Sequence, residues 1–378
     1  MAGTIKLDGA TFLEKDGGNY KITNTELKLK SSGNTIVDSS GNALVSESSG
    51  KVTLQGVTLG DTAVPNTPMM FRNKIINGNF DIWQRGTSQT NSGYGSADRW
   101  YNQHNGSSKT ASQQAFSLGQ TEVPGNPKYY LRHVVTSVSG SGYFCITQQK
   151  IEGVSTLAGK TATLSFWAKA DANKDIATEF TQNFGTGGSP STGVISIGVT
   201  THSLTTSWQK FTTTVSIPSI SGKTLGTDGN DYLHLVIWFD SESTYSSRTN
   251  SLGQQSGTFD IAQVQLEEGS AATPFEQRPI GLELSLCQRY FEICHFNVYG
   301  YVQGSTYQTG SNVFWHPKRA TPTATYTGTR DGGTNNYTGT DGGNMGDIHN
   351  SSALIRAQGA SSGVSYLVGA KWEISAEL

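Results

Sequence analysis

Four side chains with flat rings have the types and spacing that could stack on a sugar. Residues 231–240, Asp-Tyr-Leu-His-Leu-Val-Ile-Trp-Phe-Asp, alternate with a period of two and predict a strand. Tyr232, His234 and Trp238 share one of its faces, and Trp167 points outward from a second predicted strand. Aromatic rings stack on the apolar face of a pyranose, and surrounding polar groups bind its hydroxyls. The alternative is that the second sheet, a helix or a neighbouring subunit covers these rings.

The sequence contains none of the common catalytic motifs. It has no Gly-x-Ser-x-Gly elbow, no His-Glu-x-x-His, no phosphate loop and no Gly-x-Gly-x-x-Gly after a predicted strand. Its seven histidines lack the spacing of metal ligands. Acidic pairs such as Glu267 with Glu268 are interpreted as strand-edge and turn residues, not as the facing carboxylates of a glycosidase. We therefore expect a binding or structural protein and not an enzyme.

The composition predicts an all-β protein with a neutral surface. Of 378 residues only 15% are charged, and 45 are glycine, which is typical of many strands and turns. A formal charge of −2 offers no electrostatic attraction for nucleic acid. No run of 18 apolar residues occurs, so no membrane insertion is expected, and the N-terminus lacks a secretory signal. Cys145, Cys287 and Cys294 are predicted to be free thiols, with a Cys287–Cys294 disulfide as the alternative.

Residues 1–64 carry a short repeat. Ser-Gly-Asn-Thr-Ile-Val at 32–37, Ser-Gly-Asn-Ala-Leu-Val at 40–45 and Ser-Gly-Lys-Val-Thr-Leu at 49–54 follow one another closely. Each unit is too small to bury a core within one chain. We therefore expect an attachment stem, in which three chains bury these apolar residues along a shared axis. A flexible polar leader is the alternative.

The rest of the chain divides into a sandwich and a smaller C-terminal part. Strands separated by Gly- and Ser-rich turns predict a jelly-roll β-sandwich over 65–278. Pro279 opens one short predicted helix, 279–293, whose apolar stripe either docks on its own domain or lines a threefold axis. β-Signals then return, so 279–378 is predicted to be this helix followed by a small C-terminal β-domain.

Several phrases occur in an order that resembles a known class of domain. Ile-Ile-Asn-Gly-Asn-Phe-Asp-Ile-Trp-Gln-Arg-Gly at 75–86 precedes Asp-Arg-Trp-Tyr at 98–101, Leu-Ala-Gly-Lys-Thr-Ala-Thr-Leu-Ser-Phe-Trp-Ala-Lys-Ala at 157–170 and Phe-Asp-Ile-Ala-Gln-Val-Gln-Leu-Glu-Glu-Gly at 259–269. In order and spacing they resemble the carbohydrate-binding-module-like jelly roll of bacteriophage tail fibres and receptor-binding proteins. The resemblance implies packing roles for the tryptophans of the first two phrases, with a neighbouring arginine laid on a ring.

The same resemblance implies a structural calcium ion beside the first and last strands of the jelly roll. The matching positions are Asn79 and Asp260, whose oxygens suit a hard cation. Asn79 departs from the pattern, because an acidic residue is common there, and fewer anionic ligands weaken calcium binding.

A second candidate surface for sugar lies in the C-terminal domain. Tyr326, Tyr337 and the Asn-, Asp- and Thr-rich loop at 329–344 suit polar contacts without a deep pocket. If the domains follow in chain order, this tip is the part farthest from the stem and meets a cell first. We therefore expect the specific contact at the tip and a secondary sugar site on the sandwich.

The resemblance and the stem together lead to a functional hypothesis. We expect a structural virion protein, a homotrimeric tail-fibre subunit whose N-terminus attaches to other tail or collar proteins. It would adhere to host surface polysaccharide through many weak contacts. The alternatives are a head-fibre or collar decoration protein, and a glycan depolymerase with an unrecognised site.

Overall fold

The computed structural model divides into two compact units, Met1–Asn66 and Thr67–Leu378. It describes the strands of the first unit and residues 71–303, 308–327, 332–333, 344–358 and 362–378 of the second. Six antiparallel strands form two sheets in the first unit: β1 (Ile5–Leu7), β2 (Ala10–Asp16) and β3 (Asn19–Ile22); and β4 (Thr35–Val37), β5 (Ala43–Ser48) and β6 (Lys51–Leu54). Each repeat unit supplies one strand of the second sheet, since Ile36 pairs with Val45 and Val45 with Leu54.

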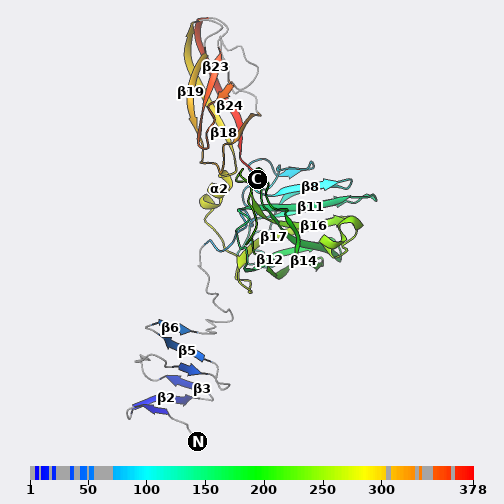
Figure 1. Ribbon diagram of the computed structural model, residues 1–378, viewed down its shortest axis with the longest axis vertical. Coiled ribbons are helices and arrows are strands. Elements are labelled where there is room, and N and C mark those ends of the chain that lie inside the picture. Colours follow the sequence, from blue (N-terminus) through cyan, green and yellow to red (C-terminus); the bar gives the residue numbers. More distant parts are fainter. Residues whose placement is uncertain are drawn as a thin grey trace. The chain divides into compact units, whose positions relative to one another are not determined.

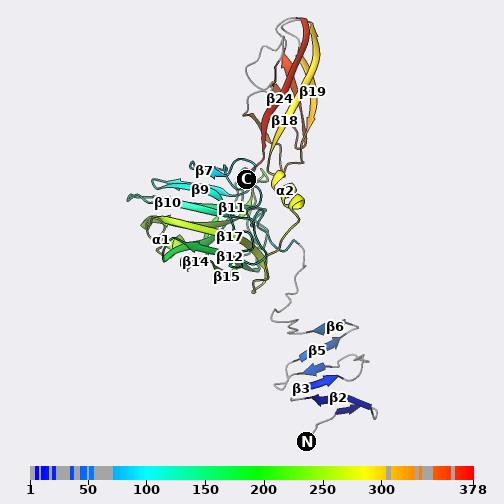
Figure 2. The same cartoon turned by 180° about the vertical axis from the view of Figure 1, so that it is seen from behind.

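The centre of the second unit is a sandwich of two antiparallel sheets (Figure 1 and Figure 2). One sheet has the order β15-β12-β17-β10-β9-β7 and the other the order β14-β13-β16-β11-β8. The predicted all-β class and jelly-roll sandwich are confirmed. The strands are β7 (Ser88–Gln89), β8 (Tyr101–Asn105), β9 (Ser108–Ala115), β10 (Tyr129–Thr136), β11 (Phe144–Glu152), β12 (Thr161–Ala170), β13 (Lys174–Asn183), β14 (Val194–Leu204), β15 (Gln209–Ser216), β16 (Tyr232–Ser241) and β17 (Gly257–Glu268).

The period-two pattern of the strands explains the core between the sheets. On β16 the residues of one face are all fully buried, while Tyr232 and His234 on the other face are half-buried. Leu164, Phe166 and Ala168 on β12 share one face of that strand and are buried in the same core as the inward residues of β16. Burial of such side chains contributes roughly 2 kcal/mol each, which holds the two sheets face to face. The inward residues of β16 are Leu233, Leu235, Ile237 and Phe239.

The opening phrase, residues 75–86, packs against the phrase at 98–101. Trp100 is fully buried and donates its indole N–H to the carbonyl of Asn77 at 3.1 Å. The predicted packing role of Trp100 is therefore correct. The stacked arginines lie on other rings, however: the Arg85 guanidinium lies 3.4 Å from the centre of the Phe291 ring. Arg99 of the phrase at 98–101 lies on the Tyr290 ring in the same way, so the two arginines join these two phrases to the segment after the sandwich.

The helix after the sandwich is shorter than predicted. It spans α2 (Ile280–Gln288), with Pro279 as its N-cap, and Phe291 already begins strand β18 (Phe291–Gln303). The chain leaves the helix because the rings of Tyr290 and Phe291 are held by the two arginines and Phe291 pairs with a strand. Tyr290 and Phe291 are buried within this chain, which corresponds to the docking alternative.

The C-terminal domain is a second, smaller β-structure. One sheet has the order β18-β24-β20, with β21 also paired to β24, and the other has the order β19-β23-β22. The side chains of Val298, Ile355 and Trp372 lie in the core between them. The remaining strands are β19 (Gln308–Phe314), β20 (Thr323–Tyr326), β21 (Gly332–Gly333), β22 (Asn344–Gly346), β23 (Ser352–Gln358) and β24 (Ser362–Ser375).

Charged contacts join this domain to the sandwich. Glu152 of β11 accepts hydrogen bonds from Arg289 at 2.8 and 3.0 Å and from the Tyr290 hydroxyl at 2.8 Å. Arg99 forms an ion pair with Glu377, and the Lys150 ammonium donates to the carbonyl of Leu378 at 2.7 Å. The end of β24 therefore lies against the sandwich, beside the C label in Figure 1.

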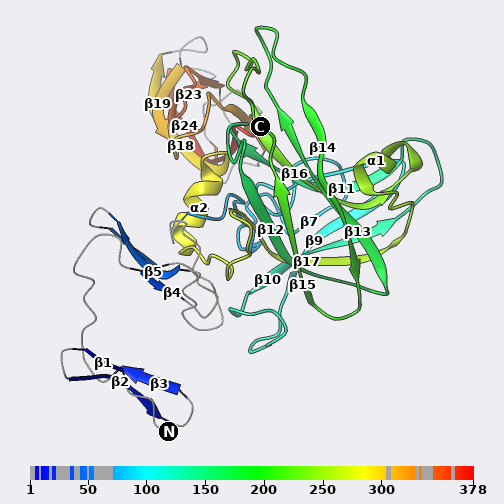
Figure 3. The ribbon, with the colours of Figure 1, turned by 60° about the horizontal axis from the view of Figure 1, so that its bottom comes forward.

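A second short helix, α1 (Ser246–Thr249), lies in the connection between β16 and β17 and packs near β13 and β14 (Figure 3). One helix was predicted, because four residues are too few to leave a helical period in the sequence.

All three cysteines are free thiols, as predicted. No helix in the described part of the chain is long and apolar enough to cross a membrane.

Candidate functional site

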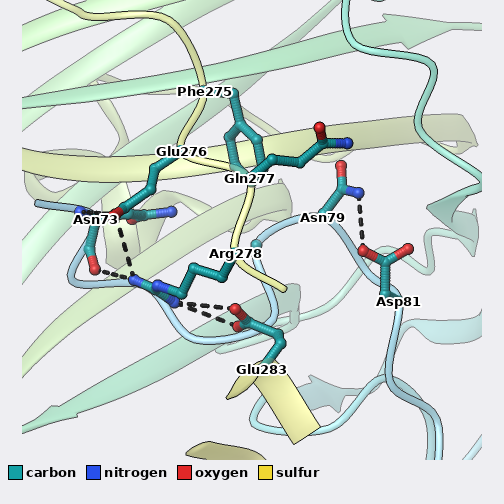
Figure 4. A pocket seen from close by; sticks show the side chains of 9 residues that line it. Asn73, Asn79, Asp81, Phe275, Glu276, Gln277, Arg278 and Glu283 are labelled. Atoms are coloured by element: carbon teal, nitrogen blue, oxygen red, sulfur yellow. Dashed lines mark hydrogen bonds and ion pairs between the residues drawn. The ribbon is translucent and has the colours of Figure 1, made fainter. Parts of the chain in front are cut away.

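A hollow lies where the opening phrase of the jelly roll, residues 75–86, meets the segment leading into α2. Its volume of about 380 Å³ is within the range of small-molecule sites. Figure 4 draws a smaller pocket beside it, which shares Asn79, Asp81, Gln277 and Arg278 with the hollow. Three segments that are far apart in the sequence form it: the opening phrase, the loop before β10 and the residues just before α2. The lining residues are Asn79, Asp81, Asn126, Lys128, Tyr129, Gln277, Arg278 and Ile280.

Arg278 anchors one wall of this hollow. Its guanidinium donates to Glu283 Oε2 at 3.2 Å and to the carbonyl of Ile75 at 3.1 Å, and it also contacts the carbonyl of Asn73. The backbone N–H of Asn73 in turn donates to Glu276 at 2.8 Å. Figure 4 shows Arg278 in contact with Asn73, Glu276 and Glu283, which joins the residues just before the opening phrase to the segment before α2 and to α2 itself. The wall is therefore preorganised before any ligand arrives.

The opposite wall contains a partly unsatisfied polar pair. Asn79 donates its amide N–H to Asp81 Oδ2 at 2.8 Å. Asn79 is only 8% exposed, and its Oδ1 is buried without a hydrogen-bond partner. Burial raises the pKa of Asp81, although the hydrogen bond from Asn79 and the charge of Lys128 act in the opposite direction. A buried acceptor beside a carboxylate is costly to leave unpaired, so this wall favours a ligand with N–H or O–H donors.

The residues implied as calcium ligands do not come together. Asp260 is bound by Arg132, whose guanidinium donates to its two oxygens at 2.7 and 2.9 Å. The backbone just before Asn79 bonds to Val264, which lies roughly 13 Å along β17 from Asp260. The carboxylate beside Asn79 is that of Asp81 instead. No group of three or more His, Cys, Asp or Glu side chains in the described ranges could hold a metal ion. The chain therefore does not fit the implied ion at these two positions.

The predicted strand face on β16 exists, but its tryptophan is covered. Trp238 is 1% exposed, and the rings of Phe144 and Tyr245 lie 5.9 and 5.1 Å from it. Its indole N–H donates to Glu179 at 3.2 Å, and Arg248 of α1 lies 5.0 Å from the ring centre. The connection between β16 and β17 thus folds over Trp238, whose ring face cannot stack on a sugar in this structure.

Two residues of the predicted face remain partly accessible. His234 contacts Thr181 through Nδ1 at 3.3 Å and packs edge-on against Tyr232, whereas its Nε2 has no partner. Burial lowers the pKa of His234 to about 3, assisted by Lys150 and Arg248, so its imidazole is neutral at pH 7. The Lys150 ammonium lies 4.7 Å from the Tyr232 ring centre. These contacts leave one half-buried tyrosine ring beside a neutral imidazole and an ammonium group, and not an aromatic platform.

The other predicted ring residues lie elsewhere. Trp167 belongs to the six-stranded sheet, where it is half-buried against Tyr130 and Trp208, so it cannot share a face with β16. Tyr326 is half-buried in the C-terminal core, 5.8 Å from the ring of Trp372. Tyr337 and most of the 329–344 loop lie outside the described residues.

Sequence reasoning missed most of the hollow. Asp81 could have been predicted from the sequence, because it lies two residues after Asn79 in the same phrase, and the residue between them, Phe80, is fully buried. Lys128 and Gln277 come from loops without periodicity, and only the fold brings them together.

No protein-family model and no curated protein matches the chain. Among solved structures, a putative sugar-binding protein from Bacteroides thetaiotaomicron is 16% identical and covers 52% of this chain and 100% of its own, with a TM-score of 0.33. A family 11 carbohydrate-binding module from Clostridium thermocellum, solved with a mixed-linked tetrasaccharide, is 11% identical over 49% of this chain and 98% of its own, with a TM-score of 0.28. The N-terminal cellulose-binding domain of a Cellulomonas fimi glucanase is 14% identical over 50% and 100%, again at 0.28. Each is similar to about half of this chain.

Proposed function

We propose that this chain is a non-catalytic saccharide-binding subunit of a bacteriophage fibre, and that the hollow between the opening phrase and α2 holds the sugar. The hollow supports this proposal because its chemistry matches a polyol. Tyr129 supplies a ring, Asn126 and Gln277 supply amides, and the Asn79–Asp81 pair supplies acceptors for hydroxyl hydrogens. Its preorganised wall limits the ordering cost of binding.

The proposed place of the chain in a virion depends on the N-terminal unit. The meander of β4, β5 and β6 places Ile36, Val45 and Leu54 opposite one another, and a three-stranded sheet alone has little core. Association of three copies through this unit would bury such residues and would make adhesion multivalent. The first unit would then attach the fibre to the particle, and the second would bind host polysaccharide.

A binding experiment on the full chain tests the site. Wild-type protein is screened on a glycan array, and the strongest ligand is then titrated by calorimetry. Asp81→Asn and Gln277→Ala remove a charged acceptor and an exposed amide from the hollow, and each should weaken binding roughly tenfold or more. Glu122→Gln, on an exposed loop residue outside the hollow, is the matched control. Unchanged affinity in both hollow variants would place the sugar elsewhere.

Two further measurements test the rest of the proposal. Release of reducing ends from a bound polysaccharide by the pure protein would contradict the non-catalytic role. Gold-labelled antibody against residues 71–378 should decorate fibres of the particle, and label confined to the capsid would favour a head decoration instead.

A further inference from the structure

An uncharged group of exposed tyrosines lies on the C-terminal domain, away from the hollow. Tyr299 and Tyr301 on β18 are 60% and 68% exposed, although tyrosine side chains are usually at least partly buried. Val364 of β24 pairs with Tyr301 and is 59% exposed, and Tyr366 pairs with Tyr299. The rings of Tyr299 and Tyr366 are nearly parallel, with centres 5.7 Å apart. We call these four residues the tyrosine face.

The strand pattern explains why these rings point outward. Val298, next to Tyr299, is fully buried in the core between the two sheets, so its neighbour in the strand must face the other way. Gly300 also faces inward, where a Cβ would overlap the side chain of Thr309. The tyrosine face is therefore held by a packed core beneath it and is not a product of loop conformation.

The position of the tyrosine face separates it from the hollow. Phe291 at the start of β18 contacts Arg85 of the sandwich, and Tyr299 lies eight residues further along, roughly 25 Å by the rise of a strand. The face therefore lies in the half of the C-terminal domain remote from the sandwich, where the long strands β18 and β24 extend in Figure 1.

The chemistry of the face indicates a neutral saccharide. Residues 298–303 of β18 and 362–370 of β24 contain no Asp, Glu, Lys or Arg. Exposed phenol rings offer flat surface on which the apolar face of a pyranose can stack, and their hydroxyl groups can bind the hydroxyls of the sugar. An acidic sugar would find no counter-charge on these strands, whereas the hollow contains the cations of Lys128 and Arg278 beside the carboxyl group of Asp81. The two sites would thus differ in the class of saccharide they accept.

A second copy of the chain is the main competing occupant. Three tyrosines and one valine could bury on the order of 600 Å² at full coverage, whereas a standard interface needs about 800 Å² from each partner. The face also contains a single aliphatic side chain among its four residues, and the phenol hydroxyls of the other three retain their need for hydrogen bonds. Size and polarity therefore favour a saccharide over a protein surface.

We infer that the tyrosine face is a second saccharide site, specific for neutral sugars. Each chain would then bind a polysaccharide at two separate sites, the hollow and the tyrosine face. This inference builds on the proposed function, and its consequence is avidity: simultaneous occupation of both sites strengthens adhesion without any additional contact.

The test uses the full chain and a matched control. Tyr299→Thr with Tyr301→Thr removes two rings while keeping residues that favour strands. Phe314→Thr removes an equally exposed ring, 72% exposed, from β19 of the other sheet. Each protein is titrated with the neutral oligosaccharide and the acidic oligosaccharide that bind wild type most strongly on the array, and its mass is measured by light scattering.

We expect the double variant to lose roughly tenfold or more in affinity for the neutral oligosaccharide. Its affinity for the acidic ligand and its mass should not change, and Phe314→Thr should behave like wild type. Equal binding of the neutral ligand by wild type and double variant would overturn this inference alone. A fall in mass of the double variant would identify the face as a contact between copies and would also overturn it. A wild type that binds no saccharide would overturn the proposed function, and this inference with it.

Discussion

Replacing Arg248 with methionine tests how the cover over Trp238 is held. Glu179 beneath this cover is fully buried and accepts hydrogen bonds from Arg248 at 2.9 Å, from Trp238 at 3.2 Å and from the backbone of Ser196 at 3.1 Å. Methionine keeps an unbranched apolar stem but removes the guanidinium, so Glu179 retains two donors and no counter-charge.

The expected loss follows from the burial of this pair. Removing one partner of a buried ion pair costs about 3–5 kcal/mol because the other charge is left uncompensated. The Arg248 side chain is 26% exposed and two donors remain, so we expect the lower end, about 3 kcal/mol. With a urea dependence of about 3 kcal/mol per molar, the unfolding midpoint should fall by about 1 M. Tryptophan fluorescence during urea unfolding measures it.

Two further variants make the result decisive. Glu179→Gln combined with Arg248→Met removes the stranded charge and should recover at least half of the lost stability. Lys160→Met breaks the ion pair with Glu268, whose side chains are 52% and 45% exposed, and should cost less than about 1 kcal/mol. If Arg248→Met lowers the free energy of unfolding no more than Lys160→Met does, then α1 does not cover a buried carboxylate. Trp238 would then again be a candidate for stacking on a sugar.

Three other outcomes are expected. Burial lowers the pKa of His202 to about 4, from an unfolded value near 6.5. The contribution of the neutral imidazole to the free energy of unfolding should therefore be fully present above pH 6.5 and fall by up to about 3 kcal/mol as the pH drops toward 4. Urea midpoints at pH 7.5 and 4.5 measure this loss, and His202→Phe should reduce it. Burial would raise the pKa of Glu152, but the hydrogen bonds from Arg289 and Tyr290 outweigh it and hold that pKa below 4.5. The contribution of Glu152 to stability is therefore present above pH 4.5 and lost as the pH falls through the lowered pKa. Glu152→Gln should lower the free energy of unfolding by about 1 kcal/mol at pH 7 in the same assay. An equal loss at pH 3 would contradict this reasoning. Light scattering at micromolar concentration should give the mass of three chains, and a stable monomer would contradict the proposed fibre.

The sequence alone determined the class of fold and the interior of its strands. Period-two alternation placed Leu235 and Phe239 of β16 in the core, because adjacent side chains of a strand point to opposite faces. The same rule placed Trp238 on the outer face correctly. It could not show that the connection after β16 returns over this ring, because the contacts that hold it, such as the ion pair between Glu179 and Arg248, join residues as far as 69 positions apart.

The candidate sites were decided by tertiary structure. The hollow joins Asp81, Lys128 and Gln277 from three segments with no shared period, so local patterns could not reveal it. The helix 279–293 was predicted too long because its stripe continues through Tyr290 and Phe291, and contacts with the two arginines end it instead. Local patterns record which face of a strand is apolar, whereas the pairing of distant polar groups appears only once the chain has folded.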